Sequence, residues 1–290
     1  PNQATAATAQ SGSDRVDEPR DPPVPPEAPA PVQASFWPAE IKDEAGAWNG
    51  RLVRLDEHLA ILTVRGSAAQ RGTAHGKLLR EEVRRLVASV NKFLTPDNGA
   101  QGRQQCAAAL KGALVMERFI EPDVLEELKA CAAAAEVHAG HLLLAQLFGD
   151  VNRALGTHSF CSSFAAFGPA TKGGKPVAGR NFDYAGHGLE GGLPLILQEL
   201  PQGEGAGRPF VTIGYAGILN GWTALNLDGL FACNNTLFAG KDSLEGMSTC
   251  FLLRKIVERG QTVEDGVRIL KETPRACTTG MLVAGRNGAA

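Results

Sequence analysis

The strongest constraint on the fold is a change of hydrophobic period near residue 160. Before it, apolar residues recur three and four positions apart, as in one expected helical stripe: Leu79, Val83, Leu86, Val87, Val90 and Leu94. After it, short β-rich segments are separated by turn residues, with one pair of helices between them. A cysteine, Cys161, stands at the change. The sequence predicts an α+β protein, helical before Cys161 and mostly strand after it.

Length and charge exclude several classes of protein. The chain has 290 residues, 43% of them apolar, which is enough for one large domain or two small ones. A net charge of −2 provides no basic field for nucleic acid or an anionic membrane. No run of about 18 apolar residues occurs, so no membrane span is expected. The chain begins with Pro1 rather than Met, which indicates a removed leader or a fragment.

The first 36 residues are rich in Ala and Pro and cannot bury enough surface to offset the entropy of ordering. We expect a disordered tether over residues 1–36, which favours an extracytoplasmic location. The folded part then covers residues 37–290. It divides into a mostly helical segment, 37–160, and a sheet segment, 161–290, that carries the cysteine.

Turn and cap residues place the individual elements. In the helical segment the sequence predicts an early strand over Leu59–Val64, followed after the first stripe by helices over Gln104–Phe119, from Pro122, and over Gly140–Arg153. In the sheet segment it predicts strand pairs 162–167 with 177–182, 195–200 with 210–215, and 222–227 with 230–235, then helices 248–259 and 263–271 and a strand 281–284. The turn Asn287–Gly288 calls for a returning strand. None is visible in the sequence, so we expect the C-terminal part of the sheet to be missing.

Cys161 is the candidate nucleophile. A catalytic thiol needs a base beside it. None of the histidines lies in a known protease signature: His58, His75, His138, His141, His158 and His187. The α-amine of the cysteine itself is an alternative base, because its unperturbed pKa of about 7.7–8.0 lies near neutral pH. That amine is free only if the Phe160–Cys161 bond is cleaved, by attack of the thiol on the Phe160 carbonyl.

The hairpin that follows the cysteine carries possible partners. With a turn centred on Gly173–Gly174, Asp183 lies near the start of the first strand and would orient the new amine. Arg180 would hold a carboxylate or an oxyanion. The two are three residues apart, so an ideal strand places them on opposite faces and a bulge or strand end must intervene. An ordinary surface ion pair is the alternative. Asn234 or Asn235, at the end of an apolar strand, would donate to an oxyanion, although spacing alone favours turn chemistry for such a pair.

These residues together resemble a known family. The stretches GSAAQRGTAHGKLL (66–79), Glu126–Glu127–Leu128 through Leu142–Leu143–Leu144, Cys161–Ser162–Ser163–Phe164 with GRNFDY (179–184), and GLFACNNTL (229–237) carry the resemblance. The family is the acyl-coenzyme A:6-aminopenicillanic acid (isopenicillin N) acyltransferases. These are N-terminal-nucleophile (Ntn) hydrolases related to choloylglycine hydrolases and acid ceramidases.

The resemblance implies a four-layer αββα fold and a zymogen that cleaves itself between Phe160 and Cys161. It implies hydrolysis or transfer of an acyl group at a linear amide, through a thioester on Cys161. Carried over by position, Asp183 and Arg180 orient the amine and the substrate, and Asn235 rather than Asn234 donates to the oxyanion. The expected partner is a small acyl amide, with acyl-coenzyme A as a candidate donor.

Other interpretations stay open at this point. The chain could be an uncleaved, non-catalytic relative that binds an acylated ligand, or a conventional Cys–His thiol protease. Phe182, Tyr184 and Trp222 would line an apolar acyl pocket, or serve simply as core. Glu136, His138 and His141 suggest a metal site only weakly, because the segment reads as a loop entering a helix. We therefore expect no metal and no cofactor, and the sequence does not predict an oligomeric state.

Overall fold

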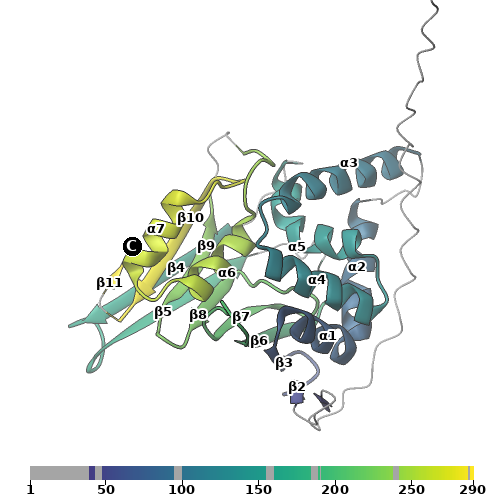
Figure 1. The fold of residues 1–290 in the computed structure, drawn as a ribbon. Helices are drawn as coiled ribbons and strands as arrows, with labels where there is room; N and C mark the ends of the chain where they lie inside the picture. The colour runs from purple at the N-terminus through teal and green to yellow at the C-terminus, as the bar shows by residue number, and fades with distance from the viewer. Residues whose placement is uncertain are drawn as a thin grey trace, which may run out of the picture.

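The computed structural model describes residues 39–42, 48–94, 100–154, 160–183, 189, 191–237, 242–286 and 288–290. The tether predicted over residues 1–36 lies outside them. The described residues form seven helices and a large sheet, so the predicted α+β class is confirmed (Figure 1).

The segment before the cysteine is mainly helical, as predicted. Its helices are α1 (Ala68–Leu78), α2 (Arg80–Leu94), α3 (Ala100–Glu117), α4 (Pro122–Ala135) and α5 (Ala139–Ala154). Pro122 begins α4, as expected for a residue that lacks an N–H, and the predicted early strand is β3 (Ala60–Gly66). Two strands precede it that the sequence did not predict, β1 (Ala39–Lys42) and β2 (Trp48–Arg54).

The segment after residue 160 follows the predicted hairpins. Its elements are β4 (Phe160–Gly168), β5 (Gly174–Asp183), β6 (Pro194–Pro201), β7 (Phe210–Tyr215), β8 (Thr223–Asn226), β9 (Phe231–Thr236), α6 (Thr249–Arg259), α7 (Val263–Glu272), β10 (Thr279–Gly285) and β11 (Gly288–Ala289). Thr262 caps α7 through a reciprocal capping box with Asp265. The expectation that no strand returns after the Asn287–Gly288 turn is wrong, because β11 pairs antiparallel with β10.

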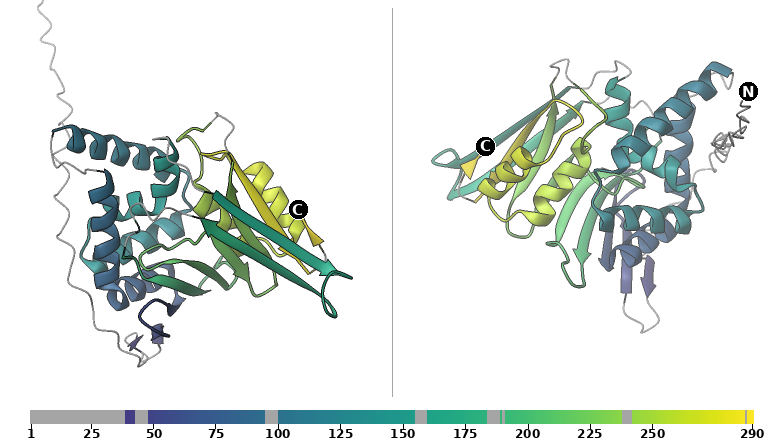
Figure 2. Two further views of the ribbon diagram at one scale, coloured as in Figure 1. Left: turned by 180° about the vertical axis from the view of Figure 1, so that it is seen from behind. Right: turned by 45° about the horizontal axis from the view of Figure 1, so that its top comes forward.

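In the described part of the chain, nine strands form one sheet in the order β1-β2-β3-β6-β7-β8-β9-β10-β11, while β4 and β5 form a separate hairpin. Strands β3 and β6 are parallel neighbours, so helices α1–α5 and the hairpin lie within the crossover between them. The helices cover one face of the sheet, and the hairpin lies across the other face, over β9 and β10 (Figures 1 and 2).

Strand register decides which side chains face the hairpin. Leu197, Thr212 and Ala224 are cross-strand neighbours and are buried beneath the helices. Ile213 and Cys233 belong to the adjacent row, which points to the opposite face. Since side chains alternate along β9, Asn235 shares the face of Cys233 and points toward the hairpin, and Asn234 points toward the helices.

Two glycines of α1 show why the stretch GSAAQRGTAHGKLL contains glycine inside a helix. A Cβ at Gly72 would lie 2.0 Å from the backbone oxygen of Glu127, and one at Gly76 would lie 2.3 Å from that of Cys131. Only hydrogen fits at these two positions, so α1 packs directly against the backbone of α4. The stretch therefore sets the contact between the first and fourth helices.

A cluster of ionised side chains, here called the buried charge cluster, joins these helices to the sheet and to α6. Its members are Arg71, Glu127, Glu199, Arg254 and Glu258, between 0% and 4% exposed. Glu127 Oε2 accepts from Nη2 of both arginines at 2.7 Å. Glu199 Oε2 accepts from Arg71 Nε at 3.0 Å and Arg254 Nη2 at 3.1 Å. The cluster thus ties α1, α4, β6 and α6 together.

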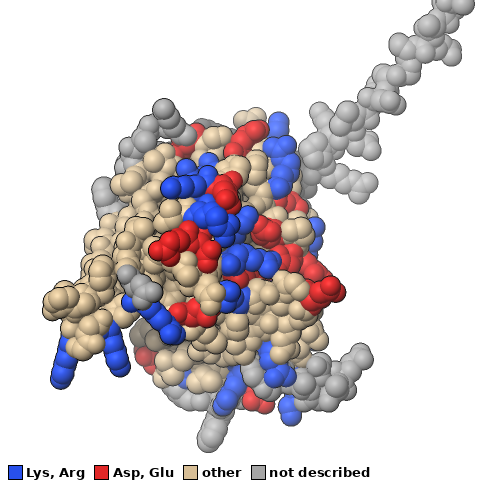
Figure 3. Space-filling view, turned by 60° about the vertical axis from the view of Figure 1, so that its left-hand side comes forward, with Lys and Arg blue, Asp and Glu red and all other residues tan. Residues whose placement is uncertain are grey.

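The surface carries both signs of charge. Figure 3 shows acidic and basic side chains interspersed over the helical face, and a protruding hairpin that is largely uncharged apart from basic residues at its tip. The turn there contains Lys172 and Lys175, both exposed. Among the described helices, none has the length and apolarity needed to cross a bilayer.

Candidate functional site

Strand β4 presents one polar face to the sheet. Cys161 and Ser163 are half-buried on that face, whereas Ser162 and Phe164 alternate with them and are exposed. The other cysteines are buried: Cys106, Cys131, Cys233, Cys250 and Cys277. Burial raises the pKa of the Cys233 thiol, the nearest of them along the facing strand β9. Cys161 is therefore the thiol most accessible to a ligand.

Arg180 of β5 binds Cys161 and links it to the sheet. Its Nη2 donates to Cys161 Sγ at 3.1 Å and to the backbone oxygen of Asn234 at 3.2 Å. The guanidinium also lies over the Phe182 ring, 4.5 Å from the ring centroid. Its Nε is buried and has no hydrogen-bond partner among the described residues. The structure thus places one predicted residue, Arg180, directly at the sulfur of another.

Asn235 reaches the hairpin from the facing strand. Its Nδ2 donates to Ser163 Oγ at 2.7 Å, and its Oδ1 is buried without a partner in the described part of the chain. The Asn234 side chain points the other way, and Asn234 contributes its backbone oxygen to Arg180. The geometry therefore brings the amide of Asn235, rather than that of Asn234, to the face that carries Cys161.

Asp183 is placed where the hairpin predicts but points outward. In the ladder, Phe160 pairs with Asp183 and Cys161 pairs with Phe182. The Asp183 carboxylate accepts from Asn181 Nδ2 at 2.9 Å through each oxygen, on the exposed face. Of the two alternatives expected between Arg180 and Asp183, the bulge is wrong, because the irregularity in this ladder lies between Ala166 and Gly168. The strand end is confirmed, because β5 ends at Asp183. Regular alternation keeps these two side chains on opposite faces.

An aromatic stack adjoins the cysteine. The rings of Phe182 and Trp222 are stacked with centroids 5.0 Å apart, and Tyr215 meets Trp222 edge-on at 6.1 Å. Phe182 is the cross-strand neighbour of Cys161, so the stack begins beside the thiol. The third predicted pocket residue, Tyr184, lies outside the described residues.

The histidines that the structure describes have partners elsewhere. His75 accepts from the Gly217 N–H at 3.0 Å, and burial lowers its pKa to about 4. His141 Nδ1 lies 2.7 Å from Asn91 Oδ1, and the His138 ring meets the His141 ring edge-on. His58 is exposed beside Glu57. Among the described residues, Arg180 is the side chain that donates to the Cys161 thiol. His158 and His187 lie outside it.

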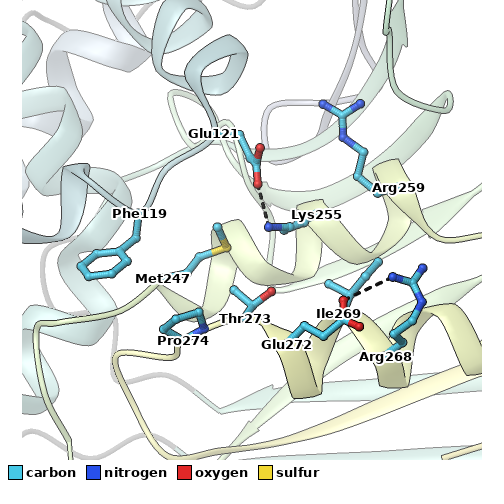
Figure 4. A pocket seen from close by; sticks show the side chains of 10 residues that line it. All are labelled: Phe119, Glu121, Met247, Lys255, Arg259, Arg268, Ile269, Glu272, Thr273 and Pro274. Atoms are coloured by element: carbon cyan, nitrogen blue, oxygen red, sulfur yellow. Dashed lines mark hydrogen bonds and ion pairs between the residues drawn. The ribbon is translucent and has the colours of Figure 1, made fainter.

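A separate pocket of about 350 Å³ opens on the helical side of the sheet (Figure 4). Its lining comes mainly from α6, α7 and the segment before α4, and Cys161 is not part of it. Lys255 pairs with Glu121 at 2.7 Å, and Arg268 pairs with Glu272 at 3.3 Å. The third cation of the lining, Arg259, pairs with Asp123 at 3.3 Å, so each of its charged side chains has a partner. Within the described residues, no group of three His, Cys, Asp or Glu side chains is arranged to hold a metal ion.

Sequence reasoning missed the part played by Ser163. The residue stood inside the quoted Cys161–Ser162–Ser163–Phe164 stretch without a role of its own. The available signal was its spacing: two residues beyond a strand cysteine, a side chain returns to the same face. What this face can do chemically follows from its groups. It combines an accessible thiol, which can act as a nucleophile, with a guanidinium at that thiol and a carboxamide N–H₂, which are donors of the kind that stabilise an oxyanion.

Comparisons with known proteins cover part of this site. Residues 170–290 match the family model "Acyl-coenzyme A:6-aminopenicillanic acid acyl-transferase", a range that includes Arg180 and Asn235 and begins after Cys161. Two curated relatives are from Dictyostelium discoideum. Protein dcd1A is 22% identical over 80% of this chain and 58% of its own length. Protein dcd1B is 23% identical over 80% of this chain and 50% of its own length. The chain thus spans about half the length of these relatives. The family match confirms that this chain resembles the acyl-coenzyme A:6-aminopenicillanic acid acyltransferase family.

Proposed function

We propose that this chain is the precursor of a self-cleaving cysteine Ntn hydrolase, which hydrolyses or transfers an acyl group at a linear amide through a thioester on Cys161. The observation that carries the proposal is the accessible Cys161 thiol at the start of β4, with Arg180 at its sulfur and the Asn235 carboxamide on the same face. The layering of helices, nine-stranded sheet and hairpin supports three of the four layers of an αββα arrangement.

Self-cleavage would proceed by acyl transfer from nitrogen to sulfur. The Cys161 sulfur attacks the Phe160 carbonyl carbon, the C–N bond between the two residues breaks, and the nitrogen takes up a proton. The product is a thioester between the Phe160 acyl group and Cys161. Water then adds to the thioester and releases the Phe160 carboxylate and the Cys161 thiol, beside the α-amine that formed when the C–N bond broke. Support comes from the position of this bond at the first residue of β4, directly across from Asp183.

In the catalytic cycle the new α-amine acts as the base. With an unperturbed pKa of about 7.7–8.0 it accepts the thiol proton as sulfur attacks the substrate carbonyl, and it later returns that proton to the departing amine. The Asn235 Nδ2–H₂ group stabilises the oxyanion that forms on the carbonyl oxygen. Arg180 orients the sulfur, and its remaining donors bind the substrate. Asp183 stays near the amine because it follows Phe182, the cross-strand partner of Cys161, and its carboxylate would turn inward when the strand end is freed.

The substrate class follows from the groups around the thiol. An acyl chain would lie along Phe182 and Trp222, because stacked aromatic rings give an apolar wall beside the reacting carbon. An acyl-coenzyme A thioester is a second donor that the same nucleophile could accept. Both kinds of substrate pass through one acyl-enzyme.

Intact-mass spectrometry of the purified protein tests the proposal. We expect two fragments that divide between Phe160 and Cys161, and we expect Cys161→Ala to remain one chain without acyl-transfer activity. The matched control is Cys233→Ala, which removes a buried thiol of the facing strand and should leave the cleavage position unchanged. A single intact chain that hydrolyses acyl amides would point to a different base. An active Cys161→Ala variant would exclude the proposed nucleophile.

A further inference from the structure

We propose that Ser163 is a positioning residue for acyl transfer: its hydroxyl holds the Asn235 carboxamide with Nδ2 turned toward the carbonyl that reacts at Cys161. This inference rests on the proposed function and adds to it a residue that sets the oxyanion donor. It concerns a side chain that touches neither the sulfur nor the leaving group.

Ser163 lies at the centre of the site. It shares the sheet-facing side of β4 with Cys161, two residues away, and it pairs across the hairpin with Arg180. Its Oγ is 2.7 Å from Asn235 Nδ2, a short bond between a strand of the hairpin and a strand of the main sheet. A bond of this length orients the group that donates it.

The bond runs from the amide to the hydroxyl: Asn235 Nδ2 donates and Ser163 Oγ accepts. A serine hydroxyl has two lone pairs, so it can accept this bond and still donate its own hydrogen elsewhere. In this orientation Nδ2, rather than Oδ1, is the amide atom turned to the hairpin.

An asparagine amide needs such a constraint. Nitrogen and oxygen are similar in shape, so rotation by 180° about the last side-chain bond exchanges a donor for an acceptor at little steric cost. Asn235 Oδ1 is buried and has no partner among the described residues, so it supplies no second anchor. The Ser163 bond uses one of the two hydrogens on Nδ2. The other remains for an oxyanion on the same face as Cys161.

The experiment compares two reactions of the same thiol. The probe p-nitrophenyl acetate acylates sulfur through an oxyanion, whereas iodoacetamide alkylates sulfur by displacement at a CH₂ group, without an oxyanion. Each rate is measured on the purified full chain after subtraction of the Cys161→Ala background. Iodoacetamide reports whether the thiol is accessible and reactive. The ratio of the two rates isolates stabilisation of the oxyanion.

For Ser163→Ala we expect acylation to slow by about tenfold, while alkylation changes by less than about twofold. Asn235→Ala should slow acylation by about 100-fold, and adding Ser163→Ala to it should cost no more, because the two residues then act as one unit. Ser163→Thr keeps the hydroxyl and should restore acylation. Ser162→Ala is the matched control: Ser162 is adjacent and exposed on the other face, so both rates should match the wild type.

The outcomes separate the two proposals. Wild-type acylation no faster than that of Cys161→Ala would contradict the proposed function. Acylation that needs Cys161 but proceeds at the wild-type rate in Ser163→Ala would overturn the inference and leave the proposed function intact. An equal loss of acylation and alkylation in Ser163→Ala would also overturn the inference. Additive losses in the double variant of Ser163→Ala and Asn235→Ala would overturn it as well. If Ser163→Ala does not fold, Ser163→Val provides the same test, because it removes the hydroxyl, suits a strand and adds no second thiol to the assay.

Discussion

Arginines serve different purposes in the two polar regions of this molecule. In the buried charge cluster, Nε, Nη1 and Nη2 of both Arg71 and Arg254 are all bonded to carboxylates or backbone oxygens. In the site, Arg180 forms its bonds through Nη2, and its buried Nε has no partner among the described residues. A guanidinium that the protein satisfies fixes elements to one another. A guanidinium with an unpaired donor beside the Cys161 thiol, such as that of Arg180, is available to a ligand.

The charges of the buried charge cluster do not balance. The cluster holds three carboxylates, Glu127, Glu199 and Glu258, against two guanidinium groups, which leaves one carboxylate in excess. Burial raises the pKa of Glu199 to about 8, and the nearby Glu127 and Glu258 carboxylates act in the same direction. Burial also opposes ionisation of Glu127, but Arg254 and Arg71 outweigh it and lower its pKa. Glu199 therefore carries the proton near neutral pH.

The largest expected effect comes from breaking the cluster. Arg254→Leu should lower the free energy of unfolding by about 3–5 kcal/mol, because it leaves buried carboxylates without a partner. Arg259→Leu, one helical turn away on α6, is the matched control. It removes a 3.3 Å pair with Asp123 in which both side chains are 37% exposed, so the cost should stay below about 1 kcal/mol. Urea unfolding followed by circular dichroism measures both values. Equal losses would show that burial does not distinguish the two pairs.

At the site we expect the opposite division between stability and activity. Asn235→Ala should slow acyl transfer by about 100-fold, since it removes a donor to the oxyanion. Its free energy of unfolding should fall by less than about 1.5 kcal/mol, because it loses one bond at a half-open face. Ser162→Ala, exposed on the outer face of β4, should change neither quantity appreciably. A large loss of stability with normal kinetics would assign Asn235 to the framework.

The last expected effect concerns pH. The unfolded chain releases the Glu199 proton near its ordinary pKa of 4.5, whereas the folded chain keeps it until about pH 8. Stability should therefore fall as pH rises through this window, with no further loss above it. Glu199→Gln should remove the slope. The charged groups that face Glu199 are Arg71, Glu127, Arg254 and Glu258.

Denaturant unfolding above about pH 6.5 measures this slope without interference from His75. The pKa of that histidine is lowered to about 4 by burial, so its own effect is a loss of stability as pH falls below 6.5. A pH slope that persists in Glu199→Gln would place the titrating proton on another member of the cluster.

Most helices and hairpins could be predicted from the sequence because their signals are local. Pro122 and Thr262 mark helix starts, and Gly173–Gly174 and Asp228–Gly229 mark turns between strands that pair as expected. Strand β2 was not predicted because Gly50 and Arg51 interrupt any alternation of apolar and polar residues. Gly50 lies against Ala74, where a Cβ would come within 2.7 Å, so its strand state depends on the helix packed above it.

The sequence by itself determined the change from helix to strand at residue 160, the Cys161 nucleophile candidate, the hairpin partners Arg180 and Asp183, and the resemblance to an acyltransferase family. These follow from period, turn residues and motif order, all of which are read along the chain. Only the tertiary structure decided that Arg180 reaches the sulfur while Asp183 points outward. It also brought Ser163 to Asn235, 72 positions away, and gathered five charges from four elements into one cluster. The physical reason is that face and contact depend on register and packing between distant segments, which local sequence patterns do not encode.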